Sequence, residues 1–245
     1  MISFIIPAKN EEKYIAACLR SIFGQKTIEP FEVIVVDNAS GDHTTEIVSR
    51  QFPRAKLLYQ SEPGTNPTRQ AGFLASKGEL VIFLDADVRL PEAWIDLVLA
   101  KLRADPKVVA ISGPYMFYDF TRVWNFLNKV LIYGLVYPWS YITNELFNIG
   151  GATMIAGNMV IRRWALEKIG GLDTRLKFFG DDTLTGMKLQ KIGKVIYTPR
   201  YWVWSSARRF NYTGPVKMVS IYFLNYFWIL FKGHPYHRDG YDIVR

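Results

Sequence analysis

Cysteine is nearly absent from this sequence, since Cys18 is the only one among 245 residues. A single thiol excludes an internal disulfide. Because Cys18 lies among apolar residues of a predicted helix, we expect it to be a buried structural thiol. The sequence also lacks an uninterrupted apolar run of about 18 residues, the usual minimum for a membrane-spanning helix. It contains no internal repeat and no low-complexity segment, so we expect one globular domain of ordinary size.

Negative charge is in the minority, with 22 Asp and Glu against 30 Lys and Arg and a formal net charge of +8. This balance favours a polyanionic neighbour, which leaves nucleic acid, a diphosphate substrate or an anionic membrane surface open. The basic residues are scattered rather than gathered with aromatic residues into one stripe, which argues against nucleic acid. Hydrophobic residues make up 49% and aromatic residues 15%, which excludes a disordered chain and indicates an apolar surface region.

Short apolar runs alternate with segments of helical periodicity through the first half of the sequence. The runs at residues 2–6, 31–36, 57–60 and 80–84 predict four strands, and helical spacing predicts a helix after each of the first three. This alternation is typical of an α/β fold with a mostly parallel sheet and helices on both faces. No secretory signal precedes the first strand, so the expected location is cytoplasmic.

Polar residues follow the predicted strands, where a parallel sheet places its ligand crevice. The most informative segment is 83–87, in which an apolar strand is followed by Asp85 and Asp87. Two carboxylates with this spacing can bind one Mg²⁺ or Mn²⁺ and leave coordination positions open for phosphate oxygens. The alternative is that both acids merely end the strand and cap the next helix, because this motif is frequent by chance.

Several segments occur together in an order that resembles the family 2 glycosyltransferases of the GT-A fold. The resemblance covers roughly residues 1–200. Each motif is weak alone, but the common order is not expected by accident. The segments that carry it are IIPAKNEE (5–12), VVDNASGD (35–42), residues 69–72, KGE (77–79), LDAD (84–87), GNM (157–159), GGLD (170–173) and FGDDT (179–183).

The resemblance implies a single Rossmann-like domain that takes a UDP- or GDP-linked sugar as donor. In such a domain Asp37 would accept a hydrogen bond from the base, and Arg69 would contact the base or the diphosphate. Asp85 would contact the ribose or the metal, and Asp87 would be the main ligand of Mn²⁺ or Mg²⁺. The other donor-binding residues implied are Pro7, Ala8, Asn10, Glu11 and Ala86. From the residues alone, Asp37 is equally consistent with a turn, and Arg69 with an exposed helical position.

The resemblance also assigns the catalytic and acceptor side. Asp182 corresponds to the general base, which removes a proton from the acceptor hydroxyl in a single inverting displacement. Asp181 replaces the glutamate that is commoner at its position, and so shortens one arm of the acid pair. Gly157 and Asn158 would contact the acceptor, a saccharide or a lipid-linked molecule. The alternative is that both acids favour a helix N-terminus electrostatically.

The C-terminal segment contains Arg208 and Arg209, which resemble the arginines that some family members place over the donor diphosphate. A solvated basic loop is the alternative. Helical periodicity predicts an amphipathic helix at 117–135 with Asn125 and Asn128 on its polar face, and an apolar helix at 218–231. These two aromatic helices would lie on the inner face of an anionic membrane or pack internally. The predicted regions are 1–112 for the donor, 113–200 for acceptor binding and catalysis, and 201–245 for the arginines and the apolar helix.

Three rival functions remain to be compared with glycosyl transfer. A nucleotidyltransferase also combines nucleotide with metal carboxylates, but it usually opens with a glycine-rich loop where this sequence has residues 7–10. A dehalogenase-type phosphatase carries its paired aspartates on the first strand, with Thr or Val where this sequence has Arg89. A catalytically silent, membrane-associated nucleotide-binding protein has no reason to keep Asp85, Asp87 and Asp182 together. The sequence therefore favours a metal-dependent glycosyltransferase, most closely of the hexosyltransferase class.

Overall fold

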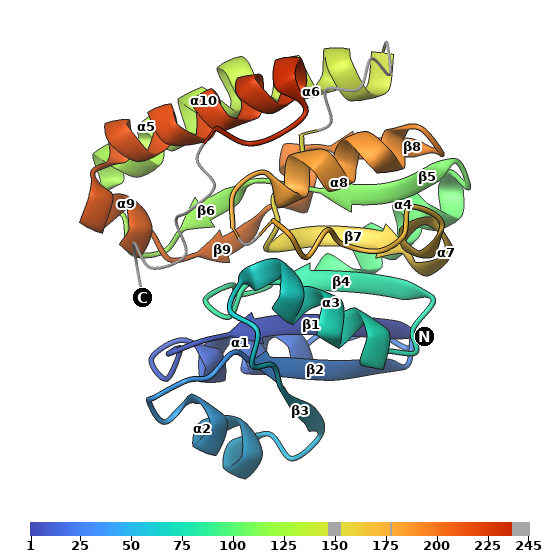
Figure 1. Cartoon of the computed structure of the whole chain (residues 1–245), viewed down its shortest axis with the longest axis vertical. Helices are drawn as coiled ribbons and strands as arrows, with labels where there is room; N and C mark the ends of the chain where they lie inside the picture. Colours follow the sequence, from blue (N-terminus) through green and yellow to red (C-terminus); the bar gives the residue numbers. More distant parts are fainter. Residues whose placement is uncertain (147–152, 177, 237–245) are drawn as a thin grey trace.

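Runs of β-branched and aromatic residues form a seven-stranded sheet in the computed structural model of the chain, which describes residues 1–146, 153–176 and 178–236 (Figure 1). The strand order is β3-β2-β1-β4-β7-β5-β8. Only β7 runs antiparallel to its neighbours β4 and β5 among the strand pairs of this sheet, so the predicted mostly parallel sheet is confirmed. The strands are β1 (Ile2–Ala8), β2 (Phe31–Asp37), β3 (Ala55–Tyr59), β4 (Leu80–Leu84), β5 (Val108–Ser112), β7 (Asn158–Arg162) and β8 (Lys194–Tyr197).

Helices cover both faces of this sheet because its strands are apolar on both sides. The helices α1 (Ile15–Phe23), α2 (Thr44–Gln51) and α4 (Trp94–Ala104) pack on the face that includes Phe4. The helices α3 (Thr65–Ala75), α7 (Arg163–Lys168) and α8 (Asp181–Gln190) pack on the opposite face, which includes Ile5. Cys18 of α1 is fully buried, as predicted. The predicted α/β architecture is therefore confirmed, and the carboxyl ends of β1, β2 and β4 lie at one edge.

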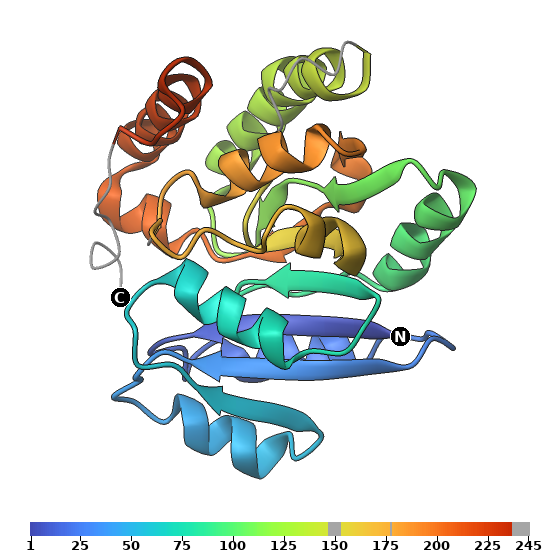
Figure 2. The same cartoon turned by 45° about the vertical axis from the view of Figure 1, so that its right-hand side comes forward.

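A second layer of helices lies beyond α8, on the same side of the sheet (Figures 1 and 2). One part is a continuous helical segment of α5 (Arg122–Leu131), η1 (Ile132–Val136), α6 (Tyr137–Ser140) and η2 (Tyr141–Leu146), in which η1 and η2 are π-helical. The other part is α9 (Arg208–Thr213) followed by α10 (Pro215–Lys232). A small parallel sheet of β6 (Tyr115–Phe117) and β9 (Val203–Ser205), the latter preceded by the 3₁₀ turn η3 (Pro199–Tyr201), connects this layer to the main sheet.

The predicted assignment of faces in the first aromatic helix is wrong for Asn125 and Asn128. Asn125 and Asn128, expected on the polar face, turn inward and donate hydrogen bonds to the carbonyls of residues 117, 120 and 115. Apolar Phe126 instead has 65% of its surface exposed. The physical reason is that the chain enters α5 from β6 and leaves backbone carbonyls that need donors, so two amides occupy the inner face. Within the described residues, no helix combines the length and apolarity needed to cross a bilayer.

Candidate functional site

The paired aspartates lie at the carboxyl end of β4, as the sequence predicts. Asp85 follows the strand directly and begins a turn that closes when the backbone N–H of Val88 donates to the carbonyl of Asp85 at 3.0 Å. Ala86 is buried in the core beneath, with 2% of its surface exposed. The methyl group of Ala86 therefore anchors the turn, while the carboxylates on either side of it remain outside the core.

One cavity of about 310 Å³ contains the acids that the sequence places far apart. Asp85, Asp87, Asp181 and Asp182 all line it. Its lining residues come partly from α8 and partly from α5 and α10, and Figures 1 and 2 show α8 below these two helices. The predicted convergence of Asp87 and Asp182 on one shared cavity is thus found in the structure.

Arg69 of α3 bridges the two acid pairs from beneath the cavity. One terminal nitrogen donates to Oδ1 of Asp85 and the other to Oδ2 of Asp181, each at 2.8 Å. The side chain of Arg69 is only 3% exposed and that of Asp181 only 4%. Arg69 was predicted to contact the base or the diphosphate. In the structure both of its terminal nitrogens are occupied by carboxylates, and they link the β4 turn to the start of α8.

Asp85 has a second side-chain partner, which the sequence analysis missed. The hydroxyl of Tyr115, in β6, donates to Oδ2 of Asp85 at 3.0 Å. Burial and the neighbouring Asp85 raise the pKa of Tyr115, so its hydroxyl keeps its proton and remains a donor. Although burial opposes ionisation, Arg69 and Arg209 hold the pKa of Asp85 below its ordinary value. The signal for Tyr115 was available, because it follows the strand at 108–112 and so lies at the ligand-binding edge.

Gly157, predicted to contact the acceptor, closes the other side of Asp85. A Cβ atom at this position would collide with the carboxyl group of Asp85 and the hydroxyl of Tyr115. Glycine is therefore required for the close approach, whether or not it touches an acceptor. Asn158, the other predicted acceptor residue, is fully buried and does not line the cavity. Its side-chain amide donates to the carbonyls of Gly113 and Tyr201, which ties β7 to the chain beyond β5.

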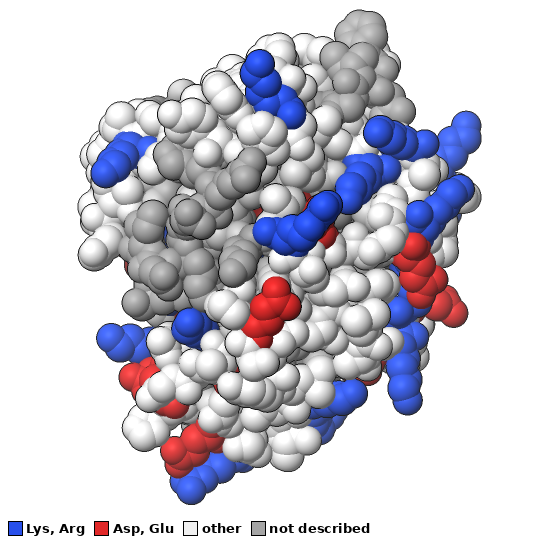
Figure 3. All heavy atoms as spheres, viewed as in Figure 1, with Lys and Arg blue, Asp and Glu red and all other residues white. Residues whose placement is uncertain are grey.

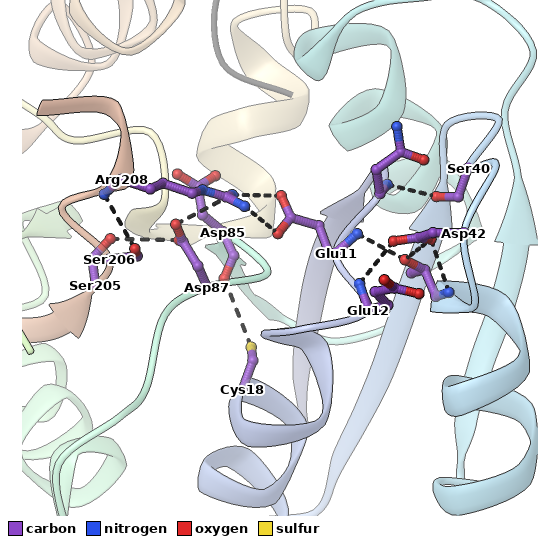
Figure 4. Close-up of polar contacts among 12 residues, drawn as sticks. Glu11, Glu12, Cys18, Ser40, Asp42, Asp85, Asp87, Ser205, Ser206 and Arg208 are labelled. Atoms are coloured by element: carbon purple, nitrogen blue, oxygen red, sulfur yellow. Dashed lines mark hydrogen bonds and ion pairs between the residues drawn. The ribbon is translucent and has the colours of Figure 1, made fainter. Parts of the chain in front are cut away.

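Arg208 connects Asp87 to the loop after β1 (Figure 4). Its two terminal nitrogens donate to the two carboxylate oxygens of Glu11 at 2.8 and 2.6 Å, and one of them lies 3.3 Å from Oδ2 of Asp87. The hydroxyl of Ser205 lies 3.5 Å from Oδ1 of Asp87. Figure 4 shows Arg208 reaching across from the C-terminal segment between these two acids. The structure therefore brings together Glu11, Asp87 and Arg208, all three predicted to bind the donor.

Arg209 lines the cavity itself. Its guanidinium carbon lies 4.8 Å from the ring centre of Phe178, and the group forms a hydrogen bond with Tyr222 of α10. Phe178 and Tyr222 also line the cavity, and the sequence analysis did not identify either as part of the site. Stacked on an aromatic ring and aimed at the acids, this guanidinium places a positive charge next to Asp85 and Asp87.

The acid pair at the start of α8 divides into two different environments. Asp181 is held by Arg69, whereas no ion pair of Asp182 occurs among residues 1–146, 153–176 and 178–236. Asp182 is half-buried and accepts a hydrogen bond from the backbone N–H of Thr183. Burial raises the pKa of Asp182, and burial raises the pKa of Asp181 to about 7 despite Arg69. Because Asp181 is paired with Arg69, Asp182 is the acid of the pair that has no ion-pair partner in the described residues, and its raised pKa makes its carboxylate a stronger base.

The loops after β1 and β2 are tied together where a nucleoside would bind. Asn10 has a left-handed backbone, donates its N–H to Ser40 and accepts from the N–H of Gly41. Pro7 and Ala8 are buried at the end of β1. Asp37 ends β2, and its Oδ2 accepts from the N–H of Ser40. Oδ1 of Asp37 is buried and has no hydrogen-bond partner in the described part of the chain. A buried acceptor oxygen without a donor is costly, which is a reason to expect an external one.

The charges around the cavity are not balanced within the described residues. Burial, Asp85 and Glu11 raise the pKa of Asp87 to about 7 against the lowering effect of Arg208. The carboxylates of Glu11, Asp85, Asp87, Asp181 and Asp182 face the guanidinium groups of Arg69, Arg208 and Arg209, which leaves two negative charges when all are ionised. No cluster of three or more His, Cys, Asp or Glu side chains suited to a metal occurs in the described ranges. A cation would therefore rest on Asp85 and Asp87 and on oxygens of a ligand.

Comparisons with known proteins agree on one family. The family model described as glycosyl transferase family 2 matches residues 3–170, more than half of the chain. A protein of Haemophilus influenzae named as an uncharacterized glycosyltransferase is 28% identical over 184 residues, which cover 74% of this chain and 59% of that protein. The probable glycosyltransferase YdaM of Bacillus subtilis is 27% identical, with 78% of this chain and 47% of that protein covered. The chain thus spans about half the length of these two relatives.

Solved structures show the same fold. A mannosyltransferase from Pyrobaculum calidifontis, solved with GDP-Man and Mn²⁺, superposes with a TM-score of 0.71 at 24% identity, over 98% of this chain and 64% of that one. TarS (residues 1–349) of S. aureus, solved with UDP, gives a TM-score of 0.66 at 19% identity, over 91% of this chain and 65% of that one. At these identities the likeness establishes the fold and not the substrate.

Proposed function

This chain belongs to glycosyl transferase family 2, and from that premise we propose that it transfers one sugar from a UDP- or GDP-linked donor to an acceptor oxygen, with inversion at the anomeric carbon. The observation that carries the proposal is the single cavity onto which Asp85, Asp87 and Asp182 converge. The solved relatives with GDP-Man and Mn²⁺ and with UDP support the donor class.

The donor base lies against Asp37 in this proposal. The buried Oδ1 of Asp37 accepts a ring N–H of the base, which is the partner this atom lacks within the described residues. Pro7 and Ala8 line the pocket from β1, and the Asn10 loop is held by Ser40 and Gly41. Because these contacts hold the two loops together before the donor arrives, little ordering of the chain is required on binding.

The diphosphate lies between the β4 turn and the C-terminal arginines. Asp85 and Asp87 would hold Mn²⁺ or Mg²⁺, and the two uncompensated negative charges of the site suit a divalent cation. When bound, the cation would neutralise charge on the departing diphosphate. Arg208 and Arg209 approach from the other side, where two guanidinium groups stabilise the same developing charge.

The acceptor oxygen lies at Asp182. For a hydroxyl acceptor, the proton passes to the Asp182 carboxylate as the oxygen forms a bond to the anomeric carbon. The bond from that carbon to the diphosphate oxygen breaks on the opposite side, and its electron pair leaves with the nucleoside diphosphate. Asp181, held by Arg69, keeps the start of α8 in position instead of sharing the proton. One displacement of this kind inverts the configuration.

The three predicted regions of the chain have different roles in this proposal. Residues 1–112 bind the nucleotide-sugar, residues 113–200 hold the acceptor and the base, and residues 201–245 supply Arg208, Arg209 and the apolar α10. In this proposal the enzyme lies on the inner, anionic face of the cell membrane, and the aromatic residues exposed on α5 and α10 support this location. No spanning helix occurs in the described ranges.

A thermal-shift panel of UDP, GDP, ADP and CDP, each with and without Mn²⁺, tests the proposal. One uracil or guanine nucleotide at about 100 times its Kd should stabilise the chain by about 2.7 kcal/mol, a rise in Tm of roughly 5–11 °C, and only with Mn²⁺ present. Asp87→Asn should remove the Mn²⁺ dependence, and Asp37→Asn should weaken the response to every concentration of the preferred nucleotide. An identical melting curve with all four nucleotides would refute the proposal.

A further inference from the structure

The cavity changes character from one end to the other. At one end Asp85, Asp87 and Asp182 form a charged wall. The walls that come from the two helices of the second layer, α5–η1 and α10, are mainly apolar, with Asn128, Tyr222, Asn225 and Tyr226 as their polar members. These two helices lie on the same side of the sheet in both views (Figures 1 and 2). The apolar lining residues are Leu131, Ile132, Val136, Val219, Phe223 and Ile229.

The apolar walls lie next to Asp182, the proposed base, in the same cavity. Gly180, just before α8, has a left-handed backbone, and a Cβ there would lie 2.5 Å from Ile229 of α10. The start of α8, which carries Asp182, is therefore packed tightly against the apolar wall. Whatever presents its oxygen to Asp182 places its next atoms among aliphatic and aromatic side chains.

Resting on the proposed function, we infer that the acceptor is an amphiphile, whose oxygen meets Asp182 and whose apolar chain lies between α5–η1 and α10. A saccharide in this position would bring several hydroxyl groups against these mainly aliphatic and aromatic walls, and each hydroxyl that does not reach Asn128, Tyr222, Asn225 or Tyr226 is left unsatisfied at a cost in free energy. An aliphatic chain gains from burial there at about 25 cal/mol per Å². The acceptor oxygen belongs to a hydroxyl or a phosphate at the head of this chain.

The surface around the cavity fits the place where such a chain resides. The helices α5 and α10 expose apolar side chains, among them Phe126 at 65%, Val130 at 52%, Leu224 at 43% and Phe231 at 81%. Their charged residues are cationic only, namely Arg122, Lys129, Lys217 and Lys232. Figure 3 shows isolated Lys and Arg on a largely uncharged surface at the upper left of the molecule, and Lys and Arg close together at its upper right. Apolar side chains with cations among them match an anionic lipid surface, from which an amphiphile enters chain-first.

Binding of model amphiphiles by isothermal titration tests the inference. Dodecyl phosphate and dodecyl glucoside are compared with butyl phosphate and butyl glucoside, all below their micellar concentrations and both with and without Mn²⁺ and the preferred nucleotide. Each buried CH₂ contributes up to about 0.8 kcal/mol, so the dodecyl compounds should bind at least about 100-fold more tightly than the butyl compounds. The two head groups distinguish a phosphate acceptor from a hydroxyl acceptor.

Neighbouring residues provide matched variants. Leu131→Gln and Phe223→Gln place an amide in the cavity wall, whereas Val130→Gln and Leu224→Gln make the same type of change on exposed side chains that do not line it. The two wall variants should lose about 10-fold or more in dodecyl affinity, and the two exposed variants should keep it. Nucleotide binding with Mn²⁺ and the melting temperature, measured on all four, show that the fold is intact.

Equal affinity for butyl and dodecyl compounds would overturn the inference, and so would equal losses in wall and exposed variants. A dimer that is weakened by Leu224→Gln and fails to bind dodecyl compounds would overturn it too, because this surface would then be covered by a second copy. If the nucleotide panel fails while the chain-length preference persists, the donor proposal is lost and the apolar site remains. If the nucleotide binds and chain length has no effect, the donor proposal stands and the inference of an amphiphilic acceptor is lost.

Discussion

Replacing Arg69 by glutamine is predicted to destabilise the fold severely, although Arg69 belongs to a ligand-binding edge rather than to the apolar core. The guanidinium bridges Asp85 and Asp181 at 2.8 Å on each side. The side chains of Arg69 and Asp181 are 3% and 4% exposed, and that of Asp85 is 22% exposed. Glutamine cannot carry the charge or reach both carboxylates, so buried Asp181 loses its ion-pair partner and Asp85 retains only the nearby charge of Arg209.

Breaking a buried ion pair by removing one partner costs about 3–5 kcal/mol, because the remaining charge is left uncompensated. For a domain of 150–250 residues, each kcal/mol lowers Tm by about 2–4 °C. We therefore expect Arg69→Gln to melt roughly 6–20 °C below the wild type at pH 8. The double variant Arg69→Gln, Asp181→Asn should recover part of this loss, since it removes the uncompensated charge of Asp181.

The loss should depend on pH with a definite sign. Burial already raises the pKa of Asp181 to about 7, above the ordinary value of 3.8, and loss of Arg69 raises it further. A carboxyl whose folded pKa is raised contributes stability below its unfolded pKa and loses it as pH rises through the folded pKa. The Arg69→Gln variant should therefore be closest to the wild type near pH 5 and furthest from it above pH 7.

Differential scanning calorimetry between pH 5 and 8, with EDTA present, measures both effects. Arg175→Gln is the matched control, because Arg175 also pairs with an aspartate, Asp173, at 2.7 Å but has a side chain 88% exposed. That control should melt like the wild type, since an exposed ion pair contributes little. If Arg69→Gln melts within about 2 °C of the wild type at pH 8, or loses as much at pH 5 as at pH 8, the assignment of a buried bridging cation is incorrect.

Two further predictions concern catalysis. Asp182→Asn should lower the rate of sugar transfer by about 10²–10⁴-fold while nucleotide affinity, measured by titration, stays within about twofold, and a parallel loss of both would mean that Asp182 holds the donor. Gly157→Ala should abolish transfer because its Cβ would collide with the carboxyl group of Asp85 and the hydroxyl of Tyr115. The companion Tyr115→Phe keeps the space but removes one hydrogen bond to Asp85, so it should retain more activity than Gly157→Ala in the same assay; the opposite ranking would exclude a steric role for Gly157.

Much of the site could be anticipated from the sequence because parallel strands place their carboxyl ends at one edge. Asp37 and the pair at 85 and 87 each follow an apolar run directly, and the structure has them at the ends of β2 and β4. Tyr115 lies a few residues beyond the apolar run at 108–111, and it was missed because no strand was predicted over that run. Asn125 and Asn128 were placed on the wrong face, since hydrophobic periodicity takes no account of backbone carbonyls that need donors.

The alternation of strands and helices over residues 2–84, the parallel pairing of these strands and the acids at their carboxyl ends follow from the sequence alone, because local periodicity decides which face of each element is buried. The carboxylate partners of the long cationic side chains cannot be predicted from the sequence in this way. Arg69 meets Asp181 across 112 residues of chain, and Arg208 meets Glu11 across 197. A guanidinium pairs with whichever carboxylate the packing of the helices brings within about 3 Å, and only the assembled layers determine that distance. Only the tertiary structure therefore determines that Asp181 of α8 is paired with Arg69 whereas its neighbour Asp182 is not.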